Sequence, residues 1–260
     1  MSSYALDNGW QEARRRLLAL EKRVEPITRR RIGQLGRLTG LRCLEVGAGL
    51  GATARWLSAC VGSRGKVVAT DIDTRFLREL DAPNLEVWEH DVTQHALPND
   101  ASDLTHVRWL LYHLPDPQAI VDRLMAALRP GGHILLEDVD FFPLAQARSR
   151  ELARLMYALS AAVGAKAGHG GEWAAQALPA LLRASHADAL RVFADLDVLH
   201  AGSSMVEFWT LTVRQMQSAL LGSGALEPEC LRSALAQFEQ EDFWSYATAH
   251  VGVSGRRSGG

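Results

Sequence analysis

Short apolar runs alternate with amphipathic stretches from Arg42 onward through the first half of the chain. The apolar runs predict strands over 43–46, 66–70, 85–89, 103–107 and 133–138. The amphipathic stretches predict helices over 52–60, 74–80 and 118–128. This rhythm is typical of βαβ units, in which parallel strands form a sheet and the connecting helices cover it.

Beyond Phe141 the pattern changes to longer segments that are rich in Ala and Leu. These segments predict helices over 144–164, 172–184, 203–221 and 227–240, and two further strands over 190–200 and 243–255. The sheet is therefore expected to end with two more strands, each preceded by extra helices. Ahead of the first strand, 10–37 is predicted to be helical, with Pro26 interrupting the pattern.

Charge and composition narrow the classes of partner. The chain has 28 Lys and Arg against 30 Asp and Glu, so no broad field favours nucleic acid or an anionic membrane. A small-molecule substrate is expected instead, with neither nucleic acid nor membrane as a partner, while a homodimer stays open. The basic residues are 25 Arg and only 3 Lys, which favours a GC-rich bacterial genome.

Cysteine usage and the absence of long apolar runs bear on the compartment. Cys43, Cys60 and Cys230 are widely separated and form no CxxC pair, which favours a reducing compartment and ordinary core packing. The N-terminus shows no secretory signal, and the longest uncharged run in the middle, 155–165, is shorter than a membrane span. We expect a cytoplasmic, soluble protein without a metal site.

The segment LEVGAGLGATARWLS carries the most informative motif. Gly47, Gly49 and Gly51 follow a predicted buried strand and open a helix, where missing side chains let backbone amides approach a ligand. The spacing is GxGxG, whereas a dinucleotide site favours GxGxxG because a pyrophosphate lies on the helix N-terminus. A glycine loop alone is weak evidence, since many nucleotide-binding folds contain one.

Acidic residues follow three successive predicted strands or loops. Glu45 lies in the glycine-loop segment, Asp71 comes 24 residues after Gly47, and Asp91 follows the third strand. The carboxyl ends of parallel strands meet at one edge of a sheet, where ligands bind. Clustered carboxylates repel a pyrophosphate but suit an ammonium group, a sulfonium and two ribose hydroxyls. The series continues with Arg108, Trp109 and Tyr112 after the fourth strand, and with LRPGG before the fifth.

This ordered series, over about residues 40–140, resembles the class I S-adenosylmethionine-dependent methyltransferases. The lead segment 4–28 and the closing strand with Gly255, Arg256 and Arg257 resemble a bacterial small-molecule, natural-product branch more loosely. The resemblance implies a Rossmann-like, doubly wound α/β fold with a seven-stranded sheet, mostly parallel with an antiparallel last strand. It also implies a single domain over 1–260 made of an N-terminal helical lid (1–40), a cofactor-binding core (41–142), helical cap insertions (143–188 and 202–241) and closing strands (189–201 and 242–257).

The resemblance also assigns roles to individual residues around S-adenosylmethionine or its product S-adenosylhomocysteine. It implies that Glu45 and the loop Gly47, Ala48 and Gly49 hold the methionine portion, that Asp71 holds the ribose and that Ile72 packs against adenine. It further implies that Asp91 and Val92 recognise the adenine amino group and that Arg108 lines the methionine end. Tyr4 and Trp10 are candidates for a mobile lid over the cofactor, and a role in which they only cover the sheet stays open. Simpler roles stay open: a tight turn at the glycines, helix or loop caps at Asp71 and Asp91, and an ion pair at Arg108.

Methyl transfer is an in-line displacement that depends on positioning, although an oxygen acceptor benefits from a general base. His113, just after the fourth strand, and His169, in a loop between predicted cap helices, are the candidates, and structural roles stay open for both. Glu137, Asp138 and Asp140 follow the fifth strand and are further groups that could face the acceptor.

The added helices are expected to cap the pocket and to set the choice of acceptor. The candidates for an apolar lining are Trp173, Met205, Phe208, Trp209 and Met216, for which ordinary core packing stays open. We expect methyl transfer to a small, hydrophobic metabolite. The alternatives are a non-methylating reaction with the same cofactor, such as cyclisation or decarboxylation, and a non-catalytic binding subunit; an NAD-dependent oxidoreductase comes third.

Overall fold

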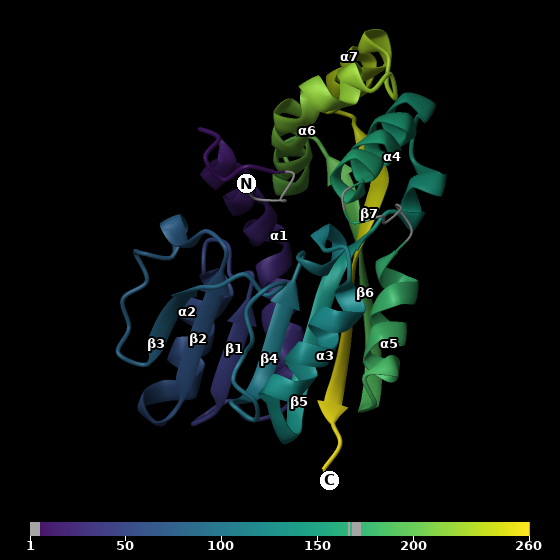
Figure 1. Ribbon diagram of the computed structural model, residues 1–260. Coiled ribbons are helices and arrows are strands. Elements are labelled where there is room, and N and C mark those ends of the chain that lie inside the picture. Colours follow the sequence, from purple (N-terminus) through teal and green to yellow (C-terminus); the bar gives the residue numbers. More distant parts are fainter. Residues whose placement is uncertain (1–5, 166, 168–172, 260) are drawn as a thin grey trace.

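A computed structural model describes residues 6–165, 167 and 173–259. It is organised around one sheet of seven strands in the order β3-β2-β1-β4-β5-β7-β6 (Figure 1). The strands are β1 (Arg42–Val46), β2 (Lys66–Asp71), β3 (Leu85–Glu89), β4 (Ser102–Arg108), β5 (Leu128–Asp140), β6 (Ala187–His200) and β7 (Trp244–Arg257). β1 to β5 pair in parallel, and β7 runs antiparallel to both β5 and β6. The predicted seven-stranded sheet with an antiparallel last strand is confirmed.

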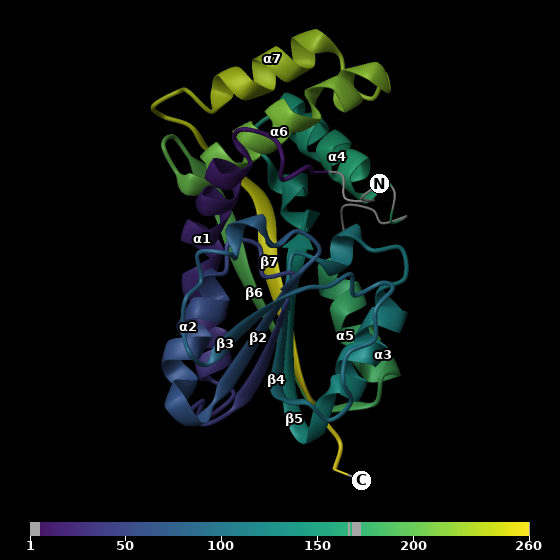
Figure 2. The same cartoon turned by 60° about the vertical axis from the view of Figure 1, so that its left-hand side comes forward.

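Helices cover both faces of the sheet and its upper edge. They are α1 (Ala13–Gly33), α2 (Ala52–Val61), α3 (Pro117–Ala127), α4 (Arg150–Gly164), α5 (Ala174–Ala184), α6 (Ser204–Gly222) and α7 (Pro228–Gln237). α1 and α2 lie on one face, and α3 and α5 lie on the other (Figure 2). α4, α6 and α7 lie beyond the carboxyl ends of the parallel strands and form a cap. Among the described residues, no helix is both long and apolar enough to cross a membrane.

The strand register brings the predicted site segments to one edge. Val46 of β1 pairs with Thr70 of β2 and with Val107 of β4, so the residues that follow these strands emerge side by side. Because β1 is the strand from which the chain winds first outward to β2 and β3 and then back to β4 and β5, this edge contains the topological switch point. The fold therefore forms a crevice there.

One predicted helix is wrong. The segment 74–80 forms only a 3₁₀ turn, Thr74–Phe76, in which the Asp73 side chain accepts a hydrogen bond from the Arg75 amide. The apolar side chains that suggested a helical face pack instead against the glycine loop. A Cβ built on Gly51 would lie 2.6 Å from a methyl carbon of Leu80 and 3.0 Å from one of Leu77. Leu77 and Leu80 therefore pack against the backbone of the glycine loop and do not form the apolar face of a helix.

Two further boundaries differ from the prediction. α1 continues through Pro26 without ending, because the side of the helix that faces the sheet is held by buried contacts over its whole length. The predicted helix 144–164 is divided into a 3₁₀ segment, Phe142–Gln146, and α4. Ser149 makes the break, since its hydroxyl accepts a hydrogen bond from the Leu152 amide at 3.0 Å and so caps α4.

Candidate functional site

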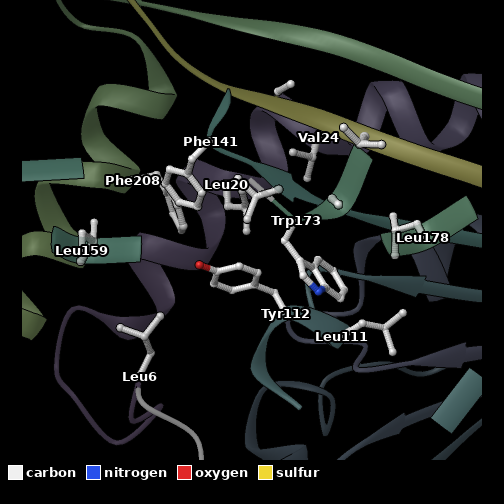
Figure 3. Close-up of a cluster of buried hydrophobic side chains, with 14 of the residues drawn as sticks. Leu6, Leu20, Val24, Leu111, Tyr112, Phe141, Leu159, Trp173, Leu178 and Phe208 are labelled. Atoms are coloured by element: carbon white, nitrogen blue, oxygen red, sulfur yellow. The ribbon is translucent and has the colours of Figure 1, made fainter. Parts of the chain in front are cut away.

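A cavity lies between the carboxyl edge of the sheet and the cap. Its lining comes from α1, the glycine loop, the ends of β2 to β5, α4 and α6. The cap side of the cavity is mostly apolar and aromatic, with Tyr112 and Phe141 in its lining. Figure 3 shows Tyr112 between Phe141 and Trp173, which belongs to the adjoining hydrophobic core. The ring centroid of Tyr112 is 6.2 Å from that of Phe141 and 5.8 Å from that of Trp173. The predicted crevice is thus a covered pocket with an aromatic wall.

The glycine loop forms the floor of this cavity with backbone atoms. The amides of Gly47 and Ala48 both donate to the Thr70 carbonyl, at 2.9 and 3.0 Å, which ties the loop to β2. Gly49 adopts φ +57°, a left-handed conformation that favours glycine, and a Cβ built there would meet no atom within 4 Å. The absent side chain of Gly49 therefore leaves open space beside the backbone.

Asp71 and Ile72 lie beside this floor and line the cavity. The Asp71 carboxylate accepts hydrogen bonds from the amides of Gly49 at 2.9 Å and Asp73 at 3.0 Å. Burial raises the pKa of Asp71, although these backbone hydrogen bonds oppose the shift. Ile72 is 47% exposed, so much of its apolar side chain is accessible at the rim of the cavity. The pair presents one polar and one apolar surface to a ligand.

Asp91 and Val92 line the same side of the cavity, after β3. Asp91 accepts from the amide and hydroxyl of Thr93 at 2.9 and 2.6 Å and from Gln94 at 2.9 Å. Desolvation raises the pKa of Asp91, but the hydrogen bonds from Thr93 and Gln94 outweigh it, so the pKa lies below its usual value. Asp91 is therefore an ionised carboxylate that caps its own turn at the rim of the cavity.

Arg108 lies at the end of β4, in the cavity lining and against α1. Its guanidinium donates to Glu25 at 2.8 Å and to the Thr28 hydroxyl at 2.9 Å. Glu25 also accepts from Thr53 of α2 at 2.8 Å. Arg108 thus makes the ion pair that the sequence left open, a largely buried one, and through it α1 is attached to the sheet edge beside the glycine loop.

Glu45 lies outside the cavity lining, although the sequence assigned it to the methionine portion. Its carboxylate bonds Nδ1 of His106 at 2.7 Å, and Nε2 of His106 bonds Glu137 at 2.9 Å. Glu137 also accepts from Arg31 of α1 at 2.6 Å. The two carboxylates raise the pKa of His106 to about 9, against the effect of burial. Glu45 therefore belongs to a buried charged network beneath the cavity.

The network extends to β7 through His250. Nδ1 of His250 accepts from the indole nitrogen of Trp109 at 3.0 Å, and Nε2 lies 3.3 Å from Glu137. Burial lowers the pKa of His250, so this imidazole is neutral and carries its proton on Nε2. Trp109 itself has φ +54°, a strained conformation for a bulky residue, and its ring faces the cavity. Sequence analysis missed this network, although charged and imidazole groups inside apolar strands were a signal for it.

The three acids in the last part of β5 lie in three different environments. Asp138 lines the cavity, where its carboxylate accepts from the amides of Tyr112 and Val139, both at 2.9 Å. Burial raises its pKa to about 7. Glu137 lies in the charged network, and Asp140 accepts from the amides of Phe142 at 2.9 Å and Ala175 at 2.8 Å. Among these three acids, Asp138 alone reaches the cavity.

Some of the candidate bases and lid residues line the cavity, and others lie elsewhere or outside the described residues. His113 lies in a 3₁₀ turn, Leu111–His113, and lines the cavity. Tyr4 and His169 lie outside the described residues. Of the predicted apolar lining, Phe208 and Trp209 face the cavity, whereas Trp173, Met205 and Met216 are buried in the hydrophobic core beside it.

Comparisons with known proteins agree with this architecture. The model of a family described as a methyltransferase domain matches residues 7–186. Methyltransferase str2 of Strobilurus tenacellus is 33% identical over 102 residues, which cover 38% of this chain and 36% of that protein. The chain thus spans about a third of the length of the curated relatives it matches first.

Solved structures show the same fold at low identity. A Bacillus halodurans C-125 protein classed as a methyltransferase superimposes with a TM-score of 0.56 at 17% identity, covering 88% of this chain and 97% of that one. Phosphoethanolamine N-methyltransferase 2 of Haemonchus contortus, in complex with S-adenosylhomocysteine, gives 0.54 at 14% identity, covering 99% of this chain and 55% of that one. Because the family model matches more than half of the chain, this protein belongs to the methyltransferase-domain family.

Proposed function

We propose that this protein binds S-adenosylmethionine in the cavity and transfers its methyl group to a small, apolar molecule. The observation that carries the proposal is the open backbone floor at Gly49 beside Asp71 and the exposed Ile72. A cofactor with a ribose diol and a flat adenine fits this set, since a carboxylate accepts from the two hydroxyls and an apolar side chain covers a ring face. The bound S-adenosylhomocysteine of the Haemonchus neighbour supports the same cofactor here.

The positions of these residues in the cavity lining support the roles that we propose for them around the cofactor. Gly47, Ala48 and Gly49 provide backbone to the methionine portion, Asp91 and Val92 border the adenine, and Arg108 lines the methionine end. When bound, the cofactor supplies a methyl group on a positively charged sulfur that leaves readily. The chain's own task is then to exclude water and to hold an acceptor atom in line with that methyl group. The largely apolar, aromatic lining of the cavity supports this role.

A general base is needed only if the acceptor atom carries a proton. His113 and Asp138 both line the cavity, and we propose them as the alternative bases. Asp138 has the stronger structural support, because its two backbone hydrogen bonds fix the carboxylate and burial sets its pKa at about 7. A base with that pKa accepts a proton effectively near neutral pH.

Calorimetry with S-adenosylmethionine tests the cofactor assignment. We expect Asp71→Ala to weaken binding about 100-fold, because two hydrogen bonds to a charged group contribute roughly 3 kcal/mol in total. The matched control is Glu89→Ala. Glu89 is the register partner of Asp71 on β3 but lies outside the cavity lining, so this variant should bind normally. Equal affinity of the Asp71→Ala variant and the wild type would refute the assignment.

We also propose that the protein works in a bacterial cytoplasm, on a metabolite of natural-product biosynthesis. The three cysteines are unpaired, which supports a reducing compartment, and the Arg-rich composition supports the source.

A further inference from the structure

Arg16 occupies an unusual position on α1. Its side chain lines the cavity yet is only 1% exposed, so it is a charged group inside the covered part of the site. Its guanidinium carbon lies 5.9 Å from the ring centroid of Phe208 on α6, which is a cation–π distance. Arg16 therefore lies where α1 meets the cap.

The guanidinium of Arg16 lacks partners that its neighbours have. Its Nε and Nη2 are buried and make no hydrogen bond within the described part of the chain, and no acid there forms an ion pair with it. The adjacent Arg15 pairs with Glu207 at 2.6 Å, and Arg31 pairs with Glu137 at 2.6 Å. An unpaired buried charge is costly, so a group that is not part of the described protein is expected to complete this site.

Acids that line the same cavity are held by other partners. Glu21, one turn further along α1, accepts from the Ala52 amide at 3.4 Å, and Asp71 accepts from the amides of Gly49 and Asp73. The wall beside Arg16 is formed by Phe208, whose carbonyl accepts a hydrogen bond from the Thr212 hydroxyl at 2.7 Å. Phe208 thus gives Arg16 an apolar contact, and none of the acids in the described part of the chain forms an ion pair with it.

The position of Arg16 assigns it to the acceptor half of the cavity. Glu25 of α1 binds Arg108 at the sheet edge, and Arg16 lies nine residues nearer the helix start, about 13 Å further along the axis. Figure 1 shows this first part of α1 rising past the strand ends toward α6. The glycine floor, by contrast, lies at the strand ends themselves. Arg16 therefore faces the space beneath the cap.

We propose that Arg16 binds the carboxylate of the acceptor, so that the substrate class is small aromatic or other apolar acids. The proposal rests on the proposed function, since it names the acceptor of that same site. A guanidinium binds a carboxylate through two parallel hydrogen bonds, and Phe208 and Trp209 would contact the apolar body. A neutral analogue would leave Arg16 unpaired, so the site discriminates strongly against it.

Binding of paired acids and amides tests the proposal. The quenching of tryptophan fluorescence, to which Trp109 and Trp209 contribute, is followed with saturating S-adenosylhomocysteine present. The ligands are benzoate, cinnamate and 2-naphthoate, each compared with its primary amide. We expect at least one acid to bind the wild type tenfold or more tightly than its amide, and Arg16→Gln to abolish that preference. Arg15→Gln, at the exposed neighbouring residue, should retain it.

Three measurements separate the outcomes. If no acid is preferred over its amide, the proposal is wrong. If Arg16→Gln weakens calorimetric binding of S-adenosylmethionine more than tenfold, Arg16 holds the cofactor's own carboxylate and the proposal is also wrong. Arg16→Met removes the unpaired charge and should not lower the melting temperature, so loss of preference in this variant cannot be ascribed to unfolding. If the wild type does not bind the cofactor, the proposed function fails, whereas acid preference is still measurable in the cofactor-free protein.

Discussion

The cofactor half and the acceptor half of the cavity are built in different ways. In the cofactor half, backbone amides at the ends of neighbouring strands satisfy the acids, as Gly49 and Asp73 do for Asp71. In the acceptor half, the groups come from distant segments, and they include the unpaired Arg16 of α1 and Asp138 of β5, whose pKa is raised to about 7. The groups proposed to bind the cofactor therefore follow the strand ends, whereas tertiary packing brings together the charged groups proposed to face the acceptor.

Substitution of Asp138 is expected to have the largest effect and to separate the two halves most clearly. Asp138→Asn should lower turnover by about 10² to 10⁴-fold for an acceptor that must lose a proton, the range typical of general-base catalysis. Cofactor affinity should stay within about twofold of the wild type. In the wild type, activity should rise as pH increases through about 7, because the carboxylate then becomes ionised.

The matched variant for this comparison is His113→Gln, which changes the other candidate base. Transfer of labelled methyl groups is measured across pH 5 to 9 with an acceptor found by mass spectrometry of copurifying ligand. A loss of turnover in His113→Gln that leaves Asp138→Asn active would assign the base to His113.

The next largest effect is expected from the buried charged network beneath both halves, and it concerns the stability of the fold. The folded-state pKa of His106 is raised from 6.5 to about 9, so its contribution is fully present below pH 6.5 and is lost as pH rises through 9. A shift of this size corresponds to about 3 kcal/mol. We expect the free energy of urea unfolding to fall over this window, and the fall to be smaller in His106→Gln. An unchanged slope in the variant would mean that His106 is neutral in the folded protein.

The difference between the halves also explains what sequence could predict. The strands and Asp71 were placed correctly at the sheet edge, because each depends on a short segment and on the rule that parallel strands end together. The network of Arg31, His106, Glu137 and His250 was not predicted, because four separate segments form it and no local spacing marks them.

Arg16 illustrates the same limit within a single helix. It belongs to the run Arg14, Arg15 and Arg16, yet packing of α1 against α6 buries it while Arg15, one residue before it, stays exposed. Arg16 lacks a partner among the described residues because of how distant segments pack around the cavity, so no sequence motif predicts it. A sequence shows which residues are charged, but it does not show which of them lack a partner in the folded protein.

Two glycines of the same loop provide a smaller effect within the cofactor half. Both have positive φ, but a Cβ at Gly49 meets open space, whereas a Cβ at Gly51 meets Leu80 at 2.6 Å. Gly49→Ala should cost about 1 to 2 kcal/mol of stability from backbone strain and should also weaken cofactor binding. Gly51→Ala should cost roughly 1 to 3 kcal/mol more from overpacking. Urea unfolding and calorimetry on both variants measure the difference, and equal stability loss would show that Leu80 yields without cost.

The smallest expected effect tests whether Ile72, the exposed apolar residue of the cofactor half, contacts a ligand. Ile72 is 47% exposed, so Ile72→Ala should change the free energy of unfolding of the cofactor-free protein by less than about 0.5 kcal/mol. Cofactor affinity should nevertheless fall about five- to tenfold. The reason is that burial of the Ile72 side chain against an adenine face would contribute about 1 kcal/mol to the binding free energy. Val192→Ala is the matched control, since Val192 is 57% exposed on β6, away from the cavity, and should change neither quantity. If Ile72→Ala binds the cofactor as tightly as the wild type, Ile72 does not contact the adenine, and the exposed surface at the end of β2 serves another purpose.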